Sequence, residues 1–301
     1  MLPLVSILIP TYNRADLISR AIDSILIQSY SNWELLIVDN HSNDSTEELI
    51  NSYKDCRINF LRIHNNGVIA HSRNKGIALS KGKYIAFLDS DDWWSPDKLK
   101  ASVYALERGA DIIYHDLFII SKKNPKPKVW RKVGAKNLGT DVFSSLISCG
   151  NALSTSSVVV SRALMLQING FSEDPLLAGA EDYDAWIRLS KLTNKFKRLK
   201  NTMGFYWQGG DNFSSAQRTI NLILYLSNIH GKEFKEENHK YLLNSDSFQY
   251  MLGKAKYQLN DLNHAEEYFS KIIKSGKINA TFIKACIWRV KLFFKNMAVF
   301  K

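Results

Sequence analysis

Three carboxylates lie within four consecutive positions of this 301-residue chain, at Asp89, Asp91 and Asp92, directly after an apolar run and directly before two tryptophans. Adjacent carboxylates repel one another and raise each other's pKa, so a site that keeps them usually supplies a cation. Carboxylate and hydroxyl oxygens suit Mg²⁺ or Mn²⁺, which fill their remaining coordination positions with water and substrate phosphates. An acid-rich helix start before Ser95-Pro96-Asp97 would explain Asp97 but not the other three acids. The cluster therefore predicts a divalent-cation site that binds a phosphorylated substrate.

The elements around this cluster alternate regularly over the first hundred residues. Short β-rich apolar runs lie at 4–9, 33–38, 58–63 and 83–88. The stretches between and after them have helical periodicity, at 14–28, 44–54, 69–80 and 96–108. This order predicts a parallel sheet flanked by helices, in which ligands bind outside the carboxyl ends of the strands. Polar residues follow every apolar run, and turn or N-cap chemistry explains only part of that pattern.

The second hundred residues are less regular. Strand candidates lie at 111–115, 156–160 and 203–207, and a helix is expected to begin near Glu181. Between Leu117 and Thr140 there are seven Lys or Arg and no Asp or Glu, which predicts an exposed loop or hairpin. From about residue 216 the composition becomes helical, and 250–276 has the spacing of a helix hairpin or of one tetratricopeptide-like pair.

Five blocks of this sequence together resemble successive signatures of the family 2 inverting glycosyltransferases. They are VSILIPTYNR, ELLIVDNHSNDST, SRNKGIALSKGKYIAFLDSDDWWSPDKL, GFSEDPLLAGAEDYDAWIRLS and FYWQGGDNFS. The resemblance implies an α/β GT-A fold with a mostly parallel central sheet, covering 1–215. Within it, 1–110 would be the nucleotide-binding half and 111–215 the acceptor and donor-sugar half. The helical extension 216–301 carries no such resemblance.

The same resemblance implies a role for individual residues. Nucleotide binding would fall to residues that follow the predicted strands or lie beside the acids: Pro10, Thr11, Tyr12, Arg14, Asp39, Arg73, Asp89 and Ser90. Asp91 would be the principal ligand of Mg²⁺ or Mn²⁺, with Asp89 beside it. Asp182 would be the general base, with Glu181 as its neighbour. Asp92, Trp93 and Trp94 are candidates for acceptor contacts, although the two tryptophans could equally be core residues that flank a helix.

Two positions complicate this assignment. Asp182 falls in the first turn of the predicted helix, where the macrodipole lowers a carboxyl pKa, while Glu181 nearby raises it. Many members of the family have a histidine near the diphosphate where this chain has Gly209. It is therefore open whether the protein supplies a third metal ligand. Asp211 or water could take the place of the histidine.

The chain has a formal charge of +11, which indicates an anionic partner. No recognised nucleic-acid-binding motif is present and the acidic cluster opposes one, so we expect no nucleic acid partner. Segment 276–301 holds six basic residues and no acidic ones among large apolar groups. It could lie in a membrane interface or pack on the catalytic domain through its apolar face. Three widely spaced cysteines and no apolar run of transmembrane length favour a cytoplasmic protein, peripheral at most on the inner face of the cytoplasmic membrane.

The function implied by the resemblance is transfer of a hexosyl or N-acetylhexosaminyl group from a UDP-sugar to a glycan or polyprenyl-linked acceptor in cell-surface polysaccharide synthesis. The alternative is a catalytically degenerate scaffold that binds nucleotide within a glycan-assembly complex. An intact set of Asp39, Asp91 and Asp182 favours the enzyme.

Overall fold

The computed structural model describes residues 2–209, 215–231 and 243–299. The chain forms two compact units, one of Met1–Phe143 with Asn151–Asp211 and one of Ser144–Gly150 with Asn212–Lys301. The second unit thus begins close to the predicted boundary at residue 215 but also takes in seven residues from the middle of the chain.

A seven-stranded sheet in the order β10-β6-β9-β4-β1-β2-β3 forms the centre of the first unit. Its strands are β1 (Val5–Thr11), β2 (Trp33–Asp39), β3 (Ile58–Arg62), β4 (Tyr84–Phe87), β6 (Ile112–Tyr114), β9 (Val159–Ser161) and β10 (Phe196–Arg198). Four of the strand pairs are parallel, and only β9 runs antiparallel to its neighbours β4 and β6. The prediction of a mostly parallel α/β sheet followed by helices is confirmed.

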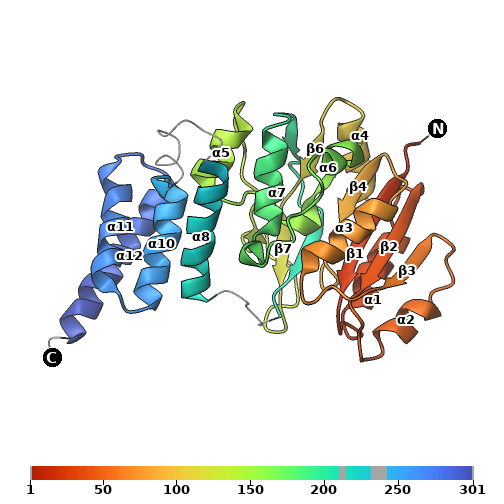
Figure 1. The fold of residues 1–301 in the computed structure, drawn as a ribbon, viewed down its shortest axis with the longest axis horizontal. Helices are drawn as coiled ribbons and strands as arrows, with labels where there is room; N and C mark the ends of the chain where they lie inside the picture. Colours follow the sequence, from red (N-terminus) through yellow and green to blue (C-terminus); the bar gives the residue numbers. More distant parts are fainter. Residues whose placement is uncertain (1, 210–214, 232–242, 300–301) are drawn as a thin grey trace. The chain divides into compact units, whose positions relative to one another are not determined.

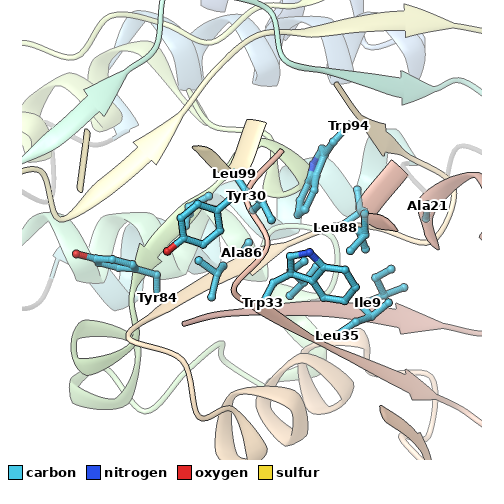
Figure 2. Packing of buried hydrophobic residues seen from close by; sticks show 14 of the residues in the cluster. Ile9, Ala21, Tyr30, Trp33, Leu35, Tyr84, Ala86, Leu88, Trp94 and Leu99 are labelled. Carbon is cyan, nitrogen blue, oxygen red and sulfur yellow. The ribbon is translucent and has the colours of Figure 1, made fainter. Parts of the chain in front are cut away.

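The predicted helices of the first hundred residues cover this sheet as α1 (Ile18–Leu26), α2 (Thr46–Ser52), α3 (Ile69–Leu79) and α4 (Lys98–Leu106). All seven residues of β1 are buried, which is why its sequence is apolar except at Ser6 and at its last residue, Thr11. Alternate residues face opposite sides, so Ile7 and Ile9 join a cluster with α1, while Leu8 meets α3. Figure 2 shows Trp33, Leu88 and Trp94 in that cluster.

A glycine lies where α3 packs closely on β1. A Cβ at Gly76 would lie 3.0 Å from Leu8 Cδ2, so a side chain there would be tight against this leucine. Helix α3 packs on β1 and β2 (Figure 1), and Arg73 lies in its N-terminal half.

A second sheet of four strands has the order β5-β11-β7-β8. It consists of β5 (Trp93–Trp94), β7 (Leu117–Ile120), β8 (Lys132–Val133) and β11 (Gly204–Trp207). The basic segment 117–140 therefore contains the antiparallel pair β7 and β8, one of the two forms expected for it. Because β5 pairs with β11, the residues that follow the acidic cluster form a strand here and not the flank of a helix.

The remaining helices are α5 (Val142–Cys149), α6 (Arg162–Gln167), α7 (Glu181–Ser190), α8 (Ala216–Gly231), α10 (Asp246–Gln258), α11 (Leu262–Lys274) and α12 (Ala280–Val299). In the second unit, α10 and α11 form the expected helix hairpin, with Asn260 at φ 62° in the turn between them. Gly253 allows the two helices to meet, because a Cβ there would lie 2.7 Å from the Phe269 ring. Among the described residues, no helix is both long enough and apolar enough to cross a membrane.

Candidate active site

The carboxyl ends of β1, β2 and β4 lie at one edge of the large sheet, as the strand order requires. Thr11, the last residue of β1, is in register with Asp39, the last residue of β2. The acidic cluster follows β4 directly and begins with a turn in which the Asp92 backbone N–H donates to the Asp89 carbonyl at 3.0 Å. The structure therefore brings the predicted nucleotide and metal residues to a common edge.

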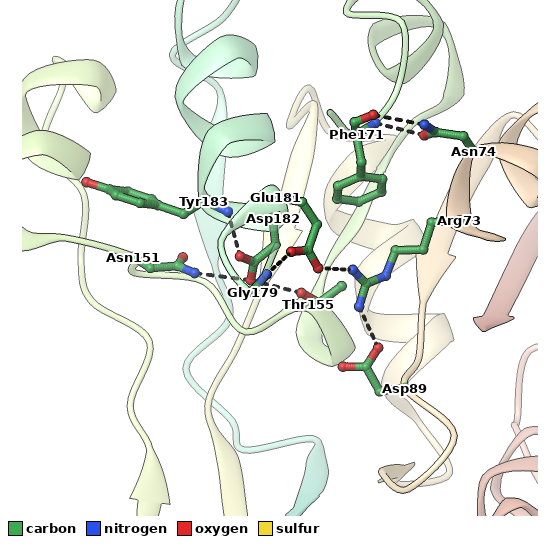
Figure 3. A network of polar contacts seen from close by, with 10 residues as sticks. All are labelled: Arg73, Asn74, Asp89, Asn151, Thr155, Phe171, Gly179, Glu181, Asp182 and Tyr183. Carbon is green, nitrogen blue, oxygen red and sulfur yellow. Dashed lines mark hydrogen bonds and ion pairs between the residues drawn. The ribbon is translucent and has the colours of Figure 1, made fainter. Parts of the chain in front are cut away.

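Arg73 joins the acidic cluster to α7. Its guanidinium, only 4% exposed, donates to Asp89 Oδ1 at 2.8 Å and to Glu181 Oε1 at 2.7 Å (Figure 3). Burial works against its charge, but Asp89 and Glu181 outweigh burial and raise the pKa of Arg73 above its usual value. The arginine is a fixed cation at the strand edge, and its Nε has no hydrogen-bond partner within the described parts of the chain.

Glu181 is the structural partner of that cation. Its second oxygen, Oε2, accepts a hydrogen bond from the Gly179 backbone N–H at 2.7 Å. Gly179 has a φ of +85°, a conformation that side-chain-bearing residues rarely adopt, so the loop before α7 is shaped to close around this carboxylate. Both oxygens of Glu181 are therefore engaged, one by Arg73 and one by the Gly179 N–H.

Asp182 lies next in sequence but points in another direction. Its Oδ2 accepts hydrogen bonds from Asn151 Nδ2 at 3.1 Å and Thr155 Oγ1 at 3.0 Å, and its Oδ1 accepts from the Tyr183 backbone N–H at 2.6 Å (Figure 3). The N-cap position of α7 is Ala180, so Asp182 is not the residue that caps the helix. Burial, followed by the charge of Glu181, raises the pKa of Asp182 to about 6, against the opposing effect of Arg73. Burial and Glu181 therefore outweigh the helix macrodipole, which alone would lower the pKa of Asp182.

Asp91 and Asp92 have different surroundings although they are adjacent. Asp91 is partly exposed, and burial followed by the charge of Asp89 raises its pKa. Asp92 is 1% exposed, and its Oδ1 accepts a hydrogen bond from the Trp207 backbone N–H at 2.8 Å. Burial, followed by Asp91 and Asp89, raises the pKa of Asp92 well above its usual value. Asp92 therefore fastens β11 to the acidic cluster, and its predicted contact with the acceptor does not fit this buried position.

The two tryptophans also differ. Trp94 is 2% exposed and donates from Nε1 to the Ser156 carbonyl at 2.7 Å, so it is a core residue that offers no surface to an acceptor. Trp93 is partly exposed and stacks on Phe205 with ring centroids 5.1 Å apart. Of the three acceptor candidates, only Trp93 keeps a surface that a sugar could reach.

A cluster around Trp93 could not be found from the sequence. The Arg20 guanidinium lies 4.5 Å from the Trp93 ring and 4.4 Å from the Trp207 ring. It also donates to the Asp91 carbonyl at 3.5 Å, so it supports the backbone of the acidic cluster. Arg20 comes from α1 and Trp207 from β11, and no local pattern connects them.

The nucleotide side of the edge is organised around Asp39. This carboxylate is fully buried and accepts hydrogen bonds from the backbone N–H and the hydroxyl of Ser42. The loop after β1 is held by backbone contacts, since the Asn13 N–H donates to Ser42 Oγ at 2.8 Å and the Arg14 N–H to Thr46 Oγ1 at 2.9 Å. These contacts leave the side chain of Tyr12 at the surface, 51% exposed, where one face of its ring is available to a planar base.

Three other residues predicted to bind the nucleotide are buried at the same edge of the sheet. Pro10 and Thr11 are buried at the end of β1, and Ser90 is 7% exposed within the acidic cluster. Thr11 Oγ1 has no hydrogen-bond partner within the described parts of the chain. His41 follows β2 and His64 follows β3, and their rings stack with centroids 3.5 Å apart. The sequence did not indicate this pair.

The residues at this edge fit a hard divalent cation without forming a closed cage. Within the described segments no group of three or more His, Cys, Asp or Glu could hold a metal. Asp91 and the Asp89 oxygen that Arg73 leaves free are the available donors. One or two carboxylates with water and substrate phosphates is the set that Mg²⁺ uses. Gly209 is exposed, and Asp211 lies outside the described residues.

A family model described as Glycosyl transferase family 2 matches residues 6–143. The chain is 41% identical over 193 residues to the putative teichuronic acid biosynthesis glycosyltransferase TuaG of Bacillus subtilis (strain 168), covering 63% of this chain and 73% of that protein. It is 34% identical over 193 residues to WfgD of Escherichia coli, described as a UDP-Glc:alpha-D-GlcNAc-diphosphoundecaprenol beta-1,3-glucosyltransferase, covering 64% of this chain and 71% of that protein.

Another relative is much longer than this chain. It is an uncharacterized glycosyltransferase of Rickettsia felis, 37% identical over 188 residues that make up 62% of this chain but only 30% of that protein. Among solved structures, S. aureus TarS 1–349 in complex with UDP-GlcNAc has a TM-score of 0.63 and 16% sequence identity, covering 89% of this chain and 81% of that chain. At this identity the likeness supports the GT-A type of fold and nothing finer.

Proposed function

The chain belongs to glycosyl transferase family 2, and on this premise we propose that it is an inverting, metal-assisted enzyme that transfers a sugar from a UDP-sugar to a glycan or polyprenyl-linked acceptor. The observation that carries the proposal is the chain of contacts Asp89–Arg73–Glu181, followed directly by Asp182. It connects the acids at the end of β4 to a carboxyl whose pKa, about 6, is suited to proton transfer at neutral pH.

Asp182 is the general base in this proposal. The acceptor hydroxyl loses its proton as it attacks the anomeric carbon, and a carboxylate on the face opposite the leaving group takes that proton. Near neutral pH a carboxyl of pKa about 6 is mostly ionised and a stronger base than an ordinary aspartate. Asn151 and Thr155 fix its orientation through Oδ2. A single displacement of this kind inverts the anomeric centre.

The other end of the reaction is the departing nucleoside diphosphate. Asp91, with the free oxygen of Asp89, would hold Mg²⁺ or Mn²⁺, and the metal when bound would supply positive charge to the diphosphate. Arg73, paired with both Asp89 and Glu181, would hold the acids of the metal site in place before the substrate arrives, which is the condition for efficient electrostatic stabilisation. Asp39, buried with both oxygens bonded to Ser42, would hold the loop beside the base in place, and the exposed ring of Tyr12 would pack on the base.

The relatives support the substrate classes. The name of WfgD describes a UDP-glucose donor and a diphosphoundecaprenol acceptor, and the name of TuaG describes teichuronic acid biosynthesis. The TarS complex contains UDP-GlcNAc. We therefore assign this chain to cell-surface polysaccharide synthesis, with a hexosyl or N-acetylhexosaminyl donor, acting in the cytoplasm or on the inner face of the cytoplasmic membrane.

The donor is tested by screening UDP-sugars and GDP-sugars, with Mn²⁺ or Mg²⁺, for thermal stabilisation of the chain. A ligand at ~100 times its Kd stabilises the folded state by about 2.7 kcal/mol, which is an easily measured rise in Tm. The proposal expects stabilisation by UDP and by one UDP-sugar, reduced when EDTA is added. Stabilisation by GDP-sugars alone would contradict the assignment of the donor.

The same preparation separates the enzyme from a catalytically degenerate nucleotide-binding scaffold. An enzyme releases UDP from its donor slowly with water and faster with an acceptor, whereas a scaffold is stabilised by UDP but releases none. UDP binding without any UDP release from every donor that stabilises the protein would favour the scaffold.

A further inference from the structure

Helix α12 is apolar on two opposite faces, and only one of them is covered. On the inner face, Phe282, Ala285, Trp288 and Leu292 pack against a core formed with Ala265, Phe269 and Ile272 of α11. Trp288 also donates from Nε1 to Tyr250 Oη of α10 at 3.1 Å. This inner face explains why the helix is stable on the second unit, where it packs on α10 and α11 and not on the catalytic domain as one of the two expectations for segment 276–301 had it.

The outer face consists of five large apolar side chains that remain in solvent. Their exposed fractions are 55% for Ile283, 52% for Ile287, 56% for Val290, 61% for Phe293 and 64% for Phe294. Four of them are spaced by four, three and four residues, so they form one stripe along the helix, and Phe293 lies at its edge. We call these five residues the outer stripe. A helix that is apolar on both sides normally has both sides covered.

The charged side chains of α12 itself are all basic. Lys284, Lys291 and Lys295 are seven and four residues apart, so they form a column along one flank of α12. They lie against aromatic rings, with Lys291 Nζ 4.4 Å from the Trp288 ring and Lys295 Nζ 4.4 Å from the Tyr257 ring. Within the described residues, none of the three forms an ion pair. On the other flank Arg289 is neutralised by Glu266 at 2.6 Å.

We propose that the outer stripe and the lysine column bind α12 to an anionic lipid bilayer, with the helix lying in the plane of the headgroups. An interfacial helix has large apolar groups on one face and lysines along its border. Helix α12 has both, and there is no acid between 276 and 301. Each lysine near such a surface strengthens binding severalfold, and its long stem lets the ammonium reach the phosphates while the stripe enters the acyl boundary. A protein surface of mixed charge would match a column of one sign less well.

The proposal stands apart from sugar transfer, because binding to vesicles is measured without donor or acceptor. The full chain is mixed with vesicles of zwitterionic lipid or of zwitterionic lipid with about 30 mol% anionic lipid, and the bound fraction is measured by co-sedimentation. We expect binding to the anionic vesicles that weakens with added salt. Absence of binding to both kinds of vesicle would overturn the proposal.

Two variants test the residues. Ile287→Ser with Phe294→Ser removes apolar area from the outer stripe and should lower the partition coefficient by about tenfold or more. The matched control is Ile27→Ser with Leu79→Ser, which changes side chains of similar exposure, 61% and 50%, in the first unit and should bind like the unmodified protein.

Replacement of the three lysines by Gln should weaken binding to anionic vesicles by about a hundredfold and change little on zwitterionic ones. Circular dichroism and Tm confirm that each variant is folded, which is expected because all the altered side chains are at the surface. Unchanged vesicle binding by the stripe variant would contradict the proposal. So would a stripe-dependent dimer in sedimentation velocity that binds no vesicles, since a second copy would then be the partner of α12.

Discussion

The raised pKa of Asp182 makes a prediction about stability that can be tested without any substrate. In the folded protein its pKa is about 6, against 3.8 for an unperturbed aspartate, a difference of about 2 units. The folded state therefore binds more protons than the unfolded state between those two pH values. Stability that is present below pH ~4 is lost as the pH rises to ~6, by up to about 3 kcal/mol. Because Asp182 is partly exposed, solvent screening reduces this figure, and we expect about 1–3 kcal/mol.

Asp182→Asn removes this penalty, because an amide does not ionise. The substitution also exchanges one acceptor oxygen for a donor among the contacts with Asn151, Thr155 and the Tyr183 N–H, which costs about 1–3 kcal/mol. That second cost does not vary with pH. The difference in unfolding free energy between the variant and the unmodified protein should therefore move in favour of the variant by about 1–3 kcal/mol between pH 4 and pH 7.

The assay is urea denaturation at a series of pH values, with Asp16→Asn as a control because Asp16 is an exposed carboxyl of the same unit. The control gives the effect of removing a surface carboxylate, and the change for Asp182→Asn is measured relative to it. A change for Asp182→Asn equal to that of the control from pH 4 to pH 7 would refute the raised pKa, and with it the electrostatic argument for Asp182 as the base.

Three further predictions concern the metal, the buried cation and the second unit. Asp91→Asn should weaken Mn²⁺-dependent UDP binding about tenfold or more by calorimetry while leaving metal-free binding unchanged; equal metal-dependent binding would show that Asp91 is not a ligand. Arg73→Lys should lower kcat/KM by about a hundredfold and stability by about 2 kcal/mol, because an ammonium cannot span the two carboxylates that the guanidinium joins; retention of full activity would contradict its assigned role. Gly253→Ala should destabilise the second unit by about 1–3 kcal/mol in urea titrations, since its Cβ would lie 2.7 Å from the Phe269 ring, and an unchanged midpoint would contradict that packing.

The strand edge could be predicted from the sequence because its signals are local. An apolar run predicts each strand, and the residue after it must lie at the carboxyl edge of the sheet. This reasoning placed Thr11, Asp39 and the acidic cluster together, as the structure has them. The helical extension was also recognisable, since the spacing of 250–276 gave the hairpin of α10 and α11.

The surroundings of individual side chains could not be predicted in the same way. Asp91 and Asp92 are neighbours in sequence, yet a turn directs Asp92 inward to the Trp207 N–H. Asn151 and Thr155 contact Asp182 from about thirty residues away, and no local pattern indicates this. The direction of the Asp182 pKa shift depended on burial, which the helix position alone could not give. Similarly, only the packing of α12 distinguishes its covered apolar face from its exposed one.

The central claim is that this site transfers a sugar and that Asp182 takes the proton. The most direct test is UDP release from the donor that stabilises the protein, measured with and without a polyprenyl diphosphate-linked acceptor, for the unmodified chain and for Asp182→Asn. We predict acceptor-dependent release by the unmodified chain and a loss of about 10²–10⁴-fold in kcat for the variant, with UDP binding retained. Equal turnover by the two proteins would contradict the account.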